Sequence, residues 1–182
     1  MRLIDPGAGL AEGKGGPSTL GSPPPGQDDE PDIRVRPIRD GTVIDHIPPG
    51  LAFAVLSILG ITSGHGSVVS VVMNVQSKAL GGRKDIVKIE ARELEKREID
   101  KIALIAPLAT INIIRGFKVA KKYKVKLPEV LEGILACPNP NCISNQREPV
   151  AGRSIVESRE PLVVTCYYCG KKHLDIIGEI RK

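Results

Sequence analysis

The spacing of apolar residues changes several times between residues 33 and 126, and each change marks a predicted element. Apolar and polar positions alternate from residue 33 and lead into a β-branched run ending at Pro48, which predicts a strand. A proline- and glycine-rich start followed by apolar residues on one helical face predicts a short buried helix over residues 51–59. Residues 67–77 and 86–89 are rich in Val and Ile and flank a glycine pair, so they predict a hairpin.

A second helix and two further strands complete this region. Between residues 93 and 106, apolar side chains repeat every 3.6 residues among charged ones, and Pro107 ends the pattern. Residues 109–115 and 117–126 then predict two strands around Gly116. The predicted order is strand, helix, strand, strand, helix, strand, with one extra strand. This order is typical of a ferredoxin-like antiparallel sheet with two helices on one face. The bare face would be available for pairing with another subunit.

The last fifty or so residues are too few for a large hydrophobic core of their own. Residues 127–135 predict a short connecting helix that leads into a strand-rich segment. We expect one domain over residues 33–128 and a small all-β domain over residues 129–182, which a structural metal would stabilise. The predicted fold class is therefore α+β.

The N-terminal residues 1–32 differ from the rest of the chain in composition. They contain seven Gly and six Pro, and an acidic run of Asp28, Asp29 and Glu30. Such a segment cannot bury a core, so we expect a disordered Gly/Pro-rich arm that a ligand or partner could order in part.

Composition narrows the classes of protein that remain. The longest apolar stretch, residues 51–61, is about eleven residues long, whereas a membrane span needs roughly twenty. The N-terminus lacks the apolar segment of a secretory signal, so we expect a cytoplasmic protein without a membrane partner. A net charge of +5 favours anionic ligands, but only 3% of the 182 residues are aromatic. That scarcity counts against a surface that stacks RNA bases, and we expect no nucleic-acid partner.

The four cysteines form two close pairs near the end of the chain, Cys137 with Cys142 and, twenty-three residues later, Cys166 with Cys169. Two tight turns that each supply two thiolates can close a tetrahedral shell, which predicts one structural Zn²⁺ per chain in a zinc-ribbon-like module. An iron–sulfur cluster or buried free thiols are the competing interpretations. Four cysteines leave no open position for catalysis. His173 could replace a ligand, but we expect it to be an ordinary surface residue.

Polar residues interrupt the predicted strands of the first domain at Asp45, His46 and Lys88, and five lysines crowd residues 118–126. One interpretation is a solvated strand end and a charged edge that discourages strand pairing. The other is a nucleotide site in which Asp45 accepts from sugar hydroxyls while His46 and a lysine face phosphates. Strict alternation would place Asp45 and His46 on opposite faces of the strand. The sequence contains neither a P-loop nor a recognisable set of catalytic residues.

Four motifs in a fixed order identify a family. They are GTVIDHIP at residues 41–48, GRKDIVKIE at 82–90, APLATIN at 106–112 and CPNPNCIS at 137–144. Together they resemble the regulatory chain of aspartate carbamoyltransferase over residues 33–182. The N-terminal arm lies outside the resemblance.

The resemblance implies a non-catalytic regulatory subunit of pyrimidine biosynthesis that binds nucleotides through its first domain and pairs with its twin. The zinc domain would dock on catalytic chains, so that three regulatory dimers join two catalytic trimers. In the family, CTP, often with UTP, inhibits and ATP activates at one site.

The same resemblance implies the residues of the nucleotide site. Asp45 and Lys88 would contact the ribose. His46, Lys122 and the backbone of Val119 would face the triphosphate. The base would lie near a further group: Val35, Pro37, Ile38, Asn112, Ile114 and Phe117.

Three positions depart from the family pattern. Pro37 has no N–H, so a base contact there must use its carbonyl group. Arg36 stands where the best-known relatives carry an acidic residue and Asp40 where they carry a basic one, which bears on the relative strength of ATP and CTP.

Two other classes of protein remain as alternatives. A zinc-ribbon nucleic-acid-binding protein could use the lysine-rich strand to follow phosphates, and its binding would weaken steeply with salt. A zinc enzyme is disfavoured because neither an open coordination position nor a general base can be named.

Overall fold

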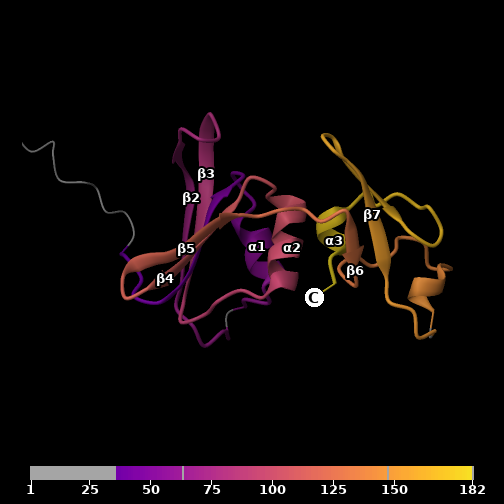
Figure 1. The fold of residues 1–182 in the computed structure, drawn as a ribbon, viewed down its shortest axis with the longest axis horizontal. Coiled ribbons are helices and arrows are strands. Elements are labelled where there is room, and N and C mark those ends of the chain that lie inside the picture. Colours follow the sequence, from indigo (N-terminus) through magenta and orange to yellow (C-terminus); the bar gives the residue numbers. More distant parts are fainter. Residues whose placement is uncertain (1–35, 63, 147, 182) are drawn as a thin grey trace, which may run out of the picture. The chain divides into compact units, whose positions relative to one another are not determined.

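The computed structural model describes residues 36–62, 64–146 and 148–181 (Figure 1). The predicted arm and Val35 lie outside these residues. Within them, the strands form a five-stranded and a three-stranded antiparallel sheet. The elements of the first sheet region are β1 (Gly41–Ile47), α1 (Ala52–Ile58), β2 (Val69–Ser77), β3 (Gly82–Glu90), α2 (Lys96–Ile105), β4 (Thr110–Arg115) and β5 (Lys118–Lys124). Those of the second are β6 (Val130–Glu132), η1 (Ile143–Asn145), β7 (Arg153–Arg159), β8 (Leu162–Cys166) and α3 (Ile176–Glu179).

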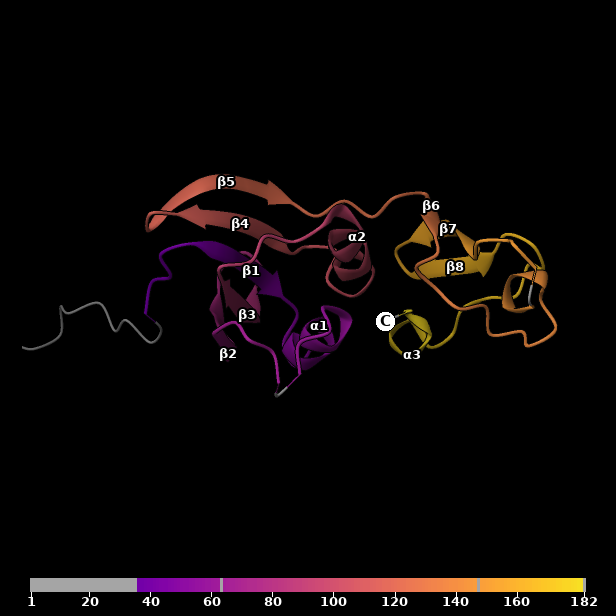
Figure 2. The ribbon, with the colours of Figure 1, turned by 90° about the horizontal axis from the view of Figure 1, so that it is seen from below.

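The five-stranded sheet has the predicted ferredoxin-like arrangement, with the order β2-β3-β1-β4-β5 and β5 as the extra edge strand. Both helices cover the same face of this sheet, as Figures 1 and 2 show. The central row of that face pairs Ile44 with Val87 on one side and with Ile111 on the other, and all three side chains are fully buried. The alternation of apolar residues in the sequence therefore specifies the face that packs against the helices.

Two bulges lie opposite one buried carboxylate in the middle of β3. In both β1 and β2 one extra residue interrupts the pairing with β3, and His46 and Asn74 in these bulges have φ values of 61° and 62°. Asp85 is fully buried and accepts from the backbone N–H groups of Gly50 at 2.8 Å, Ala52 at 3.2 Å and Asn74 at 2.8 Å. One side chain thus fixes both the start of α1 and the bulge of β2.

The predicted connecting helix over residues 127–135 is wrong, because this segment contains β6 instead. β6 pairs with β7, with Leu131 opposite Ser154, and only 1% of Leu131 is exposed. A helix of nine residues is marginal in water, whereas strand pairing here satisfies backbone groups and buries an apolar side chain.

Helices in the described part of the chain are short. The longest, α2, has ten residues, and no helix there is long and apolar enough to cross a membrane.

Candidate functional site

The two cysteine pairs meet at one end of the three-stranded sheet. Cys137 and Cys142 flank a tight loop, Cys166 ends β8, and Cys169 follows in the next turn. The four sulfur atoms lie within 4.8 Å of one another, with Cys137 3.5 Å from Cys169 and Cys142 3.7 Å from Cys166. Zinc–sulfur bonds of ~2.3 Å in a tetrahedron separate sulfur atoms by about 3.8 Å. The geometry therefore fits a four-thiolate zinc centre, and the predicted four-cysteine cluster is confirmed.

Hydrogen bonds around the cluster favour the thiolate form that binds metal. The backbone N–H of Lys171 lowers the pKa of Cys169 to about 6. Burial opposes ionisation of Cys142, but its hydrogen bonds with Ser144, whose Oγ lies 3.3 Å from the sulfur, and with neighbouring thiols lower its pKa overall. Burial raises the pKa of Cys137. A bound cation would stabilise all four thiolates together.

His173 is not the surface residue that the sequence suggested. It is 6% exposed, its Nε2 lies 3.0 Å from Ser154 Oγ, and its Nδ1 lies 2.5 Å from Glu179 Oε2. The neighbouring lysines in the sequence are exposed, but the backbone N–H of His173 pairs with Val164 of β8 and carries the side chain into the interior. His173 thus connects β7 to α3 and lies outside the cysteine cluster.

The second candidate site lies on the face of the five-stranded sheet opposite α1 and α2, here called the open face. Directly paired residues share a face of the sheet. One row across the strands consists of Ser70, Lys88, Val43, Asn112 and Lys122. The adjoining core row faces the helices, so this row faces away from them. The structure therefore brings three of the predicted nucleotide residues, Lys88, Asn112 and Lys122, onto one surface.

Asp45 lies on the open face together with a lysine that the sequence analysis missed. Lys84 Nζ approaches the two carboxylate oxygens of Asp45 at 2.8 and 3.1 Å. Lys84 is four residues before Lys88 in β3, so the two-residue period of a strand could have revealed it. Strict alternation would place Asp45 and His46 on opposite faces of the sheet. Because β1 has a bulge after Ile44, this alternation does not apply to His46.

His46 lines a cavity of about 230 Å³ beside the open face, together with Thr110, Lys122 and Lys124. Its Nδ1 is buried and lies 3.5 Å from Asp45 Oδ2, but it forms no hydrogen bond among the described residues. A hydroxyl group, an imidazole and two ammonium groups around one hollow are suited to an oxyanion, since charge-assisted hydrogen bonds are strong. The side chains at this end of the open face are therefore the ones best suited to an anion.

The other predicted residues lie toward the opposite end of β1. Ile114 pairs with Val119 across β4 and β5, two rows beyond Asn112. Ile38 is buried, whereas Phe117 is 65% exposed in the β4–β5 turn. The backbone N–H of Phe117 donates to Arg39 at 2.9 Å and holds this turn beside the segment that contains Pro37.

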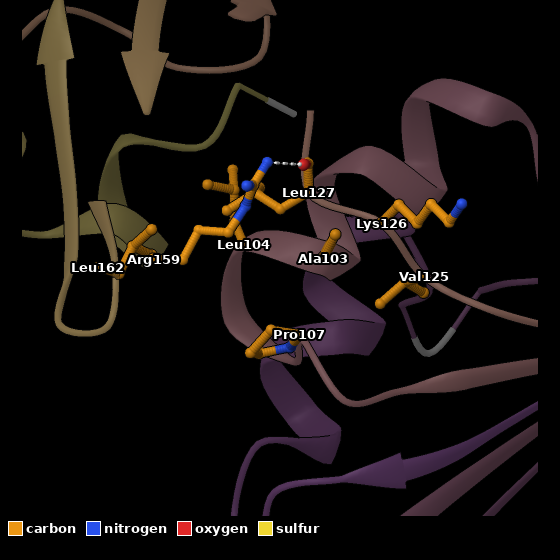
Figure 3. Close-up of a pocket in the computed structure, with 8 residues that line it drawn as sticks. All are labelled: Ala103, Leu104, Pro107, Val125, Lys126, Leu127, Arg159 and Leu162. Atoms are coloured by element: carbon orange, nitrogen blue, oxygen red, sulfur yellow. Dashed lines mark hydrogen bonds between the residues drawn. The ribbon is translucent and has the colours of Figure 1, made fainter. Parts of the chain in front are cut away.

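A larger hollow, of about 420 Å³, lies between α2, residues 125–127 and the β7–β8 hairpin (Figure 3). Most of its walls are apolar, formed by Leu104, Pro107, Leu127, Leu162 and others. Arg159 spans it and donates to the carbonyl of Leu127 at 3.0 Å, while Lys126 extends away from Arg159. Its polar groups do not converge as a nucleotide would require.

Comparison with known proteins gives matches along both sheet regions. Residues 33–126 match the family model of the aspartate carbamoyltransferase regulatory chain, allosteric domain, and residues 129–177 match that of the metal-binding domain of the same chain. A regulatory chain from Methanothrix thermoacetophila is 53% identical over 150 residues, covering 82% of this chain and 97% of the relative. One from Hyperthermus butylicus is 61% identical over 139 residues, covering 76% and 86%.

Proposed function

Because the chain belongs to the family of aspartate carbamoyltransferase regulatory chains, which are non-catalytic subunits, we propose that it is an allosteric sensor of nucleoside triphosphates. CTP, with UTP, would inhibit and ATP would activate from one shared site on the open face. Residues 33–128 would form the nucleotide-binding domain and residues 129–182 the zinc domain that docks on catalytic chains.

The observation that carries this proposal is the distribution of charge along β1 and its neighbours. Lys122, Lys124 and His46 gather at one end, while the row of Ile114 and Val119 at the other end is apolar. The rows of Thr110 and Ile114 are four residues apart, which is about 13 Å along a strand. An elongated ligand with a phosphate end and an aromatic end would match this polarity.

Each part of the nucleotide would then meet a suitable group. The triphosphate would bind Lys122 and His46, and the ribose would lie near Asp45 and Lys88. The backbone of Val119, which the sequence assigned to the triphosphate, pairs with Ile114 and would contact the part of the nucleotide that approaches the apolar end. The carboxylate of Asp45 already accepts from Lys84, which holds it in place for sugar hydroxyls. The base would lie against Ile114 and Phe117, and the main chain of Ile38 would read its edge, with Val35, Pro37 and Asn112 nearby.

The four cysteines would hold one structural Zn²⁺, which stabilises a small sheet that has little core of its own. Two such chains would pair through their nucleotide-binding domains, and three dimers would join two catalytic trimers in the cytoplasm. An effector can shift this assembly only through its different affinities for two states, typically ~1–3 kcal/mol.

Calorimetric titration of the full chain with CTP and with ATP tests the nucleotide site. Lys122→Ala should weaken binding by roughly 10–100-fold, because a charge-assisted hydrogen bond contributes about 1.5–3 kcal/mol, and Asp45→Ala should also weaken it. The matched control is Lys121→Ala, since Lys121 pairs with the core residue Ile113 and faces the other side of β5. Unchanged affinity in both site variants, or an equal loss in the control, would exclude the assigned pocket.

A further inference from the structure

Residues 173–181, here called the C-terminal strap, join parts of the chain that are far apart in sequence. The backbone N–H of Arg181 donates to Ile134 at 2.8 Å, and that of Ala136 donates to Glu179 at 2.8 Å. Ile180 is 7% exposed and belongs to the apolar cluster that also contains residues of α1 and α2. The strap therefore lies between the three-stranded sheet and α2.

A buried lysine of α2 reaches the strap. Lys101 is 8% exposed, and its ammonium group donates to the carbonyl of Arg181 at 2.6 Å. Among the described residues no carboxylate forms an ion pair with it. Burial lowers the pKa of Lys101. Burying an ammonium group on a carbonyl alone is costly compared with an apolar side chain. This contact therefore adds little to the free energy of unfolding. Its main effect is to fix the position of the strap against α2.

The strap continues from that contact to the cysteine cluster. The guanidinium group of Arg181 donates to the carbonyl of Leu135 at 3.3 Å and to that of Ser144 at 3.4 Å. Ser144 Oγ in turn lies 3.3 Å from the sulfur of Cys142. A continuous series of hydrogen bonds thus runs from Lys101 through Arg181 and Ser144 to one of the four metal ligands.

Apolar packing beside this series is incomplete. The hollow of about 420 Å³ in Figure 3 separates Leu104 of α2 from Leu162 of the β7–β8 hairpin. Where side chains do not interdigitate, a shift of one element is not transmitted directly to the next. The polar contacts of α2 with the following domain therefore add to the apolar packing of Ile180 in the cluster that contains α2. One is Lys101 to Arg181, and another is the exposed hydrogen bond from Arg97 to the carbonyl of Gly133.

We propose that Lys101 and Arg181 are positioning residues that couple the metal-binding loop to α2. When the metal is lost, the loop at Cys142 becomes less ordered, and the hydrogen bonds of Ser144 and Arg181 transmit this change to the C-terminal half of α2. A displacement of α2 affects the loop through the same contacts. The regulatory meaning of this coupling rests on the proposed function, but the coupling itself requires no nucleotide.

Hydrogen exchange of the full chain, loaded with zinc or stripped by a chelator, tests the coupling. In the wild type, stripping should speed exchange of the amides at residues 101–105 at least tenfold. In Lys101→Met these amides should respond less than twofold, while the cysteine loop still responds fully, and Lys101→Arg should restore the response in part. Lys96→Met is the matched control, because it removes an exposed ion pair with Asp100 within the same helix that does not lead to Arg181. It should behave as wild type.

A second measurement follows the path from its other end. Transfer of zinc from the full chain to a chromophoric chelator should be about tenfold faster in Arg181→Met, a difference equivalent to about 1.4 kcal/mol in the barrier. Lys172→Met, an exposed lysine near the cluster, should leave the rate unchanged. An α2 response that persists in Lys101→Met, its absence in the wild type, or an unchanged zinc-transfer rate in Arg181→Met would overturn the proposal. Failure to bind CTP would overturn only the proposed function.

Discussion

Asp85 offers a sharp test of how the five-stranded sheet is held together. Its carboxylate is fully buried in β3, with one oxygen accepting from Gly50 and Ala52 and the other from Asn74. Asp85→Asn preserves the shape of the side chain but places an NH₂ group where one carboxylate oxygen stood. Whichever way the amide is turned, at least one backbone N–H then faces another donor.

The magnitude follows from these contacts. If the remaining oxygen faces Gly50 and Ala52, both hydrogen bonds persist without a charged acceptor, and each weakens by about 1 kcal/mol. The N–H of Asn74 is left buried and unsatisfied, at a further cost of about 1–3 kcal/mol. Relief of carboxylate desolvation offsets part of this loss. We expect a net loss of about 3 kcal/mol, which lowers Tm by roughly 12–24 °C in a domain of about 100 residues.

Urea and thermal denaturation of the zinc-loaded chain measure this loss, and Glu93→Gln is the matched control. Glu93 is 53% exposed and pairs with Arg115 at the surface, so its amide should cost less than about 1 kcal/mol. If Asp85→Asn proved as stable as the wild type, the cost of burying the carboxylate would outweigh its three hydrogen bonds. The view that Asp85 anchors α1 and β2 energetically would then be wrong.

Two further predictions concern the metal and Lys101. A chelator that strips the metal should disorder the cysteine loops and release the catalytic chains from the complex, because thiolates brought together by a cation repel without it. A metal-free complex that stays intact in sedimentation velocity contradicts this. Folding lowers the pKa of Lys101 from 10.5, so the unfolded chain binds more protons between the folded-state pKa and 10.5, and stability should rise with pH across that window. The unfolding free energy of Lys101→Met should lack this rise with pH. If the difference in unfolding free energy between wild type and Lys101→Met stayed constant from neutral pH to pH 10.5, burial would not perturb the pKa of Lys101.

The elements of the first domain could be predicted because their signals are local. The two-residue period around Ile44 and the 3.6-residue period of α2 each follow from which side chains face one core. The strand order followed from the element order, since short connections allow few topologies. The cysteine cluster was predictable for a similar reason, because two close pairs in tight turns bring four sulfur atoms within reach of one ion.

Short segments were predicted less well where distant partners decide the conformation. Residues 130–132 have no strong periodicity, and β7 makes them a strand by offering a free edge. His173 lies in a polar stretch of sequence, but pairing with Val164 turns it toward Ser154 and Glu179. Propensity is a weak prior over such short lengths, and tertiary contacts override it.

The sequence alone predicts a ferredoxin-like sheet, a four-thiolate cluster, and several cations together with Asp45 on the strands of that sheet. Three features depend instead on tertiary contacts. Lys84 lies beside Asp45, a bulge brings His46 to the same hollow as Lys122, and Lys101 donates to Arg181. Periodicity and ligand spacing are properties of neighbouring residues and can be read along the chain. Register shifts and contacts across 80 residues depend on how whole elements pack, which no local pattern specifies.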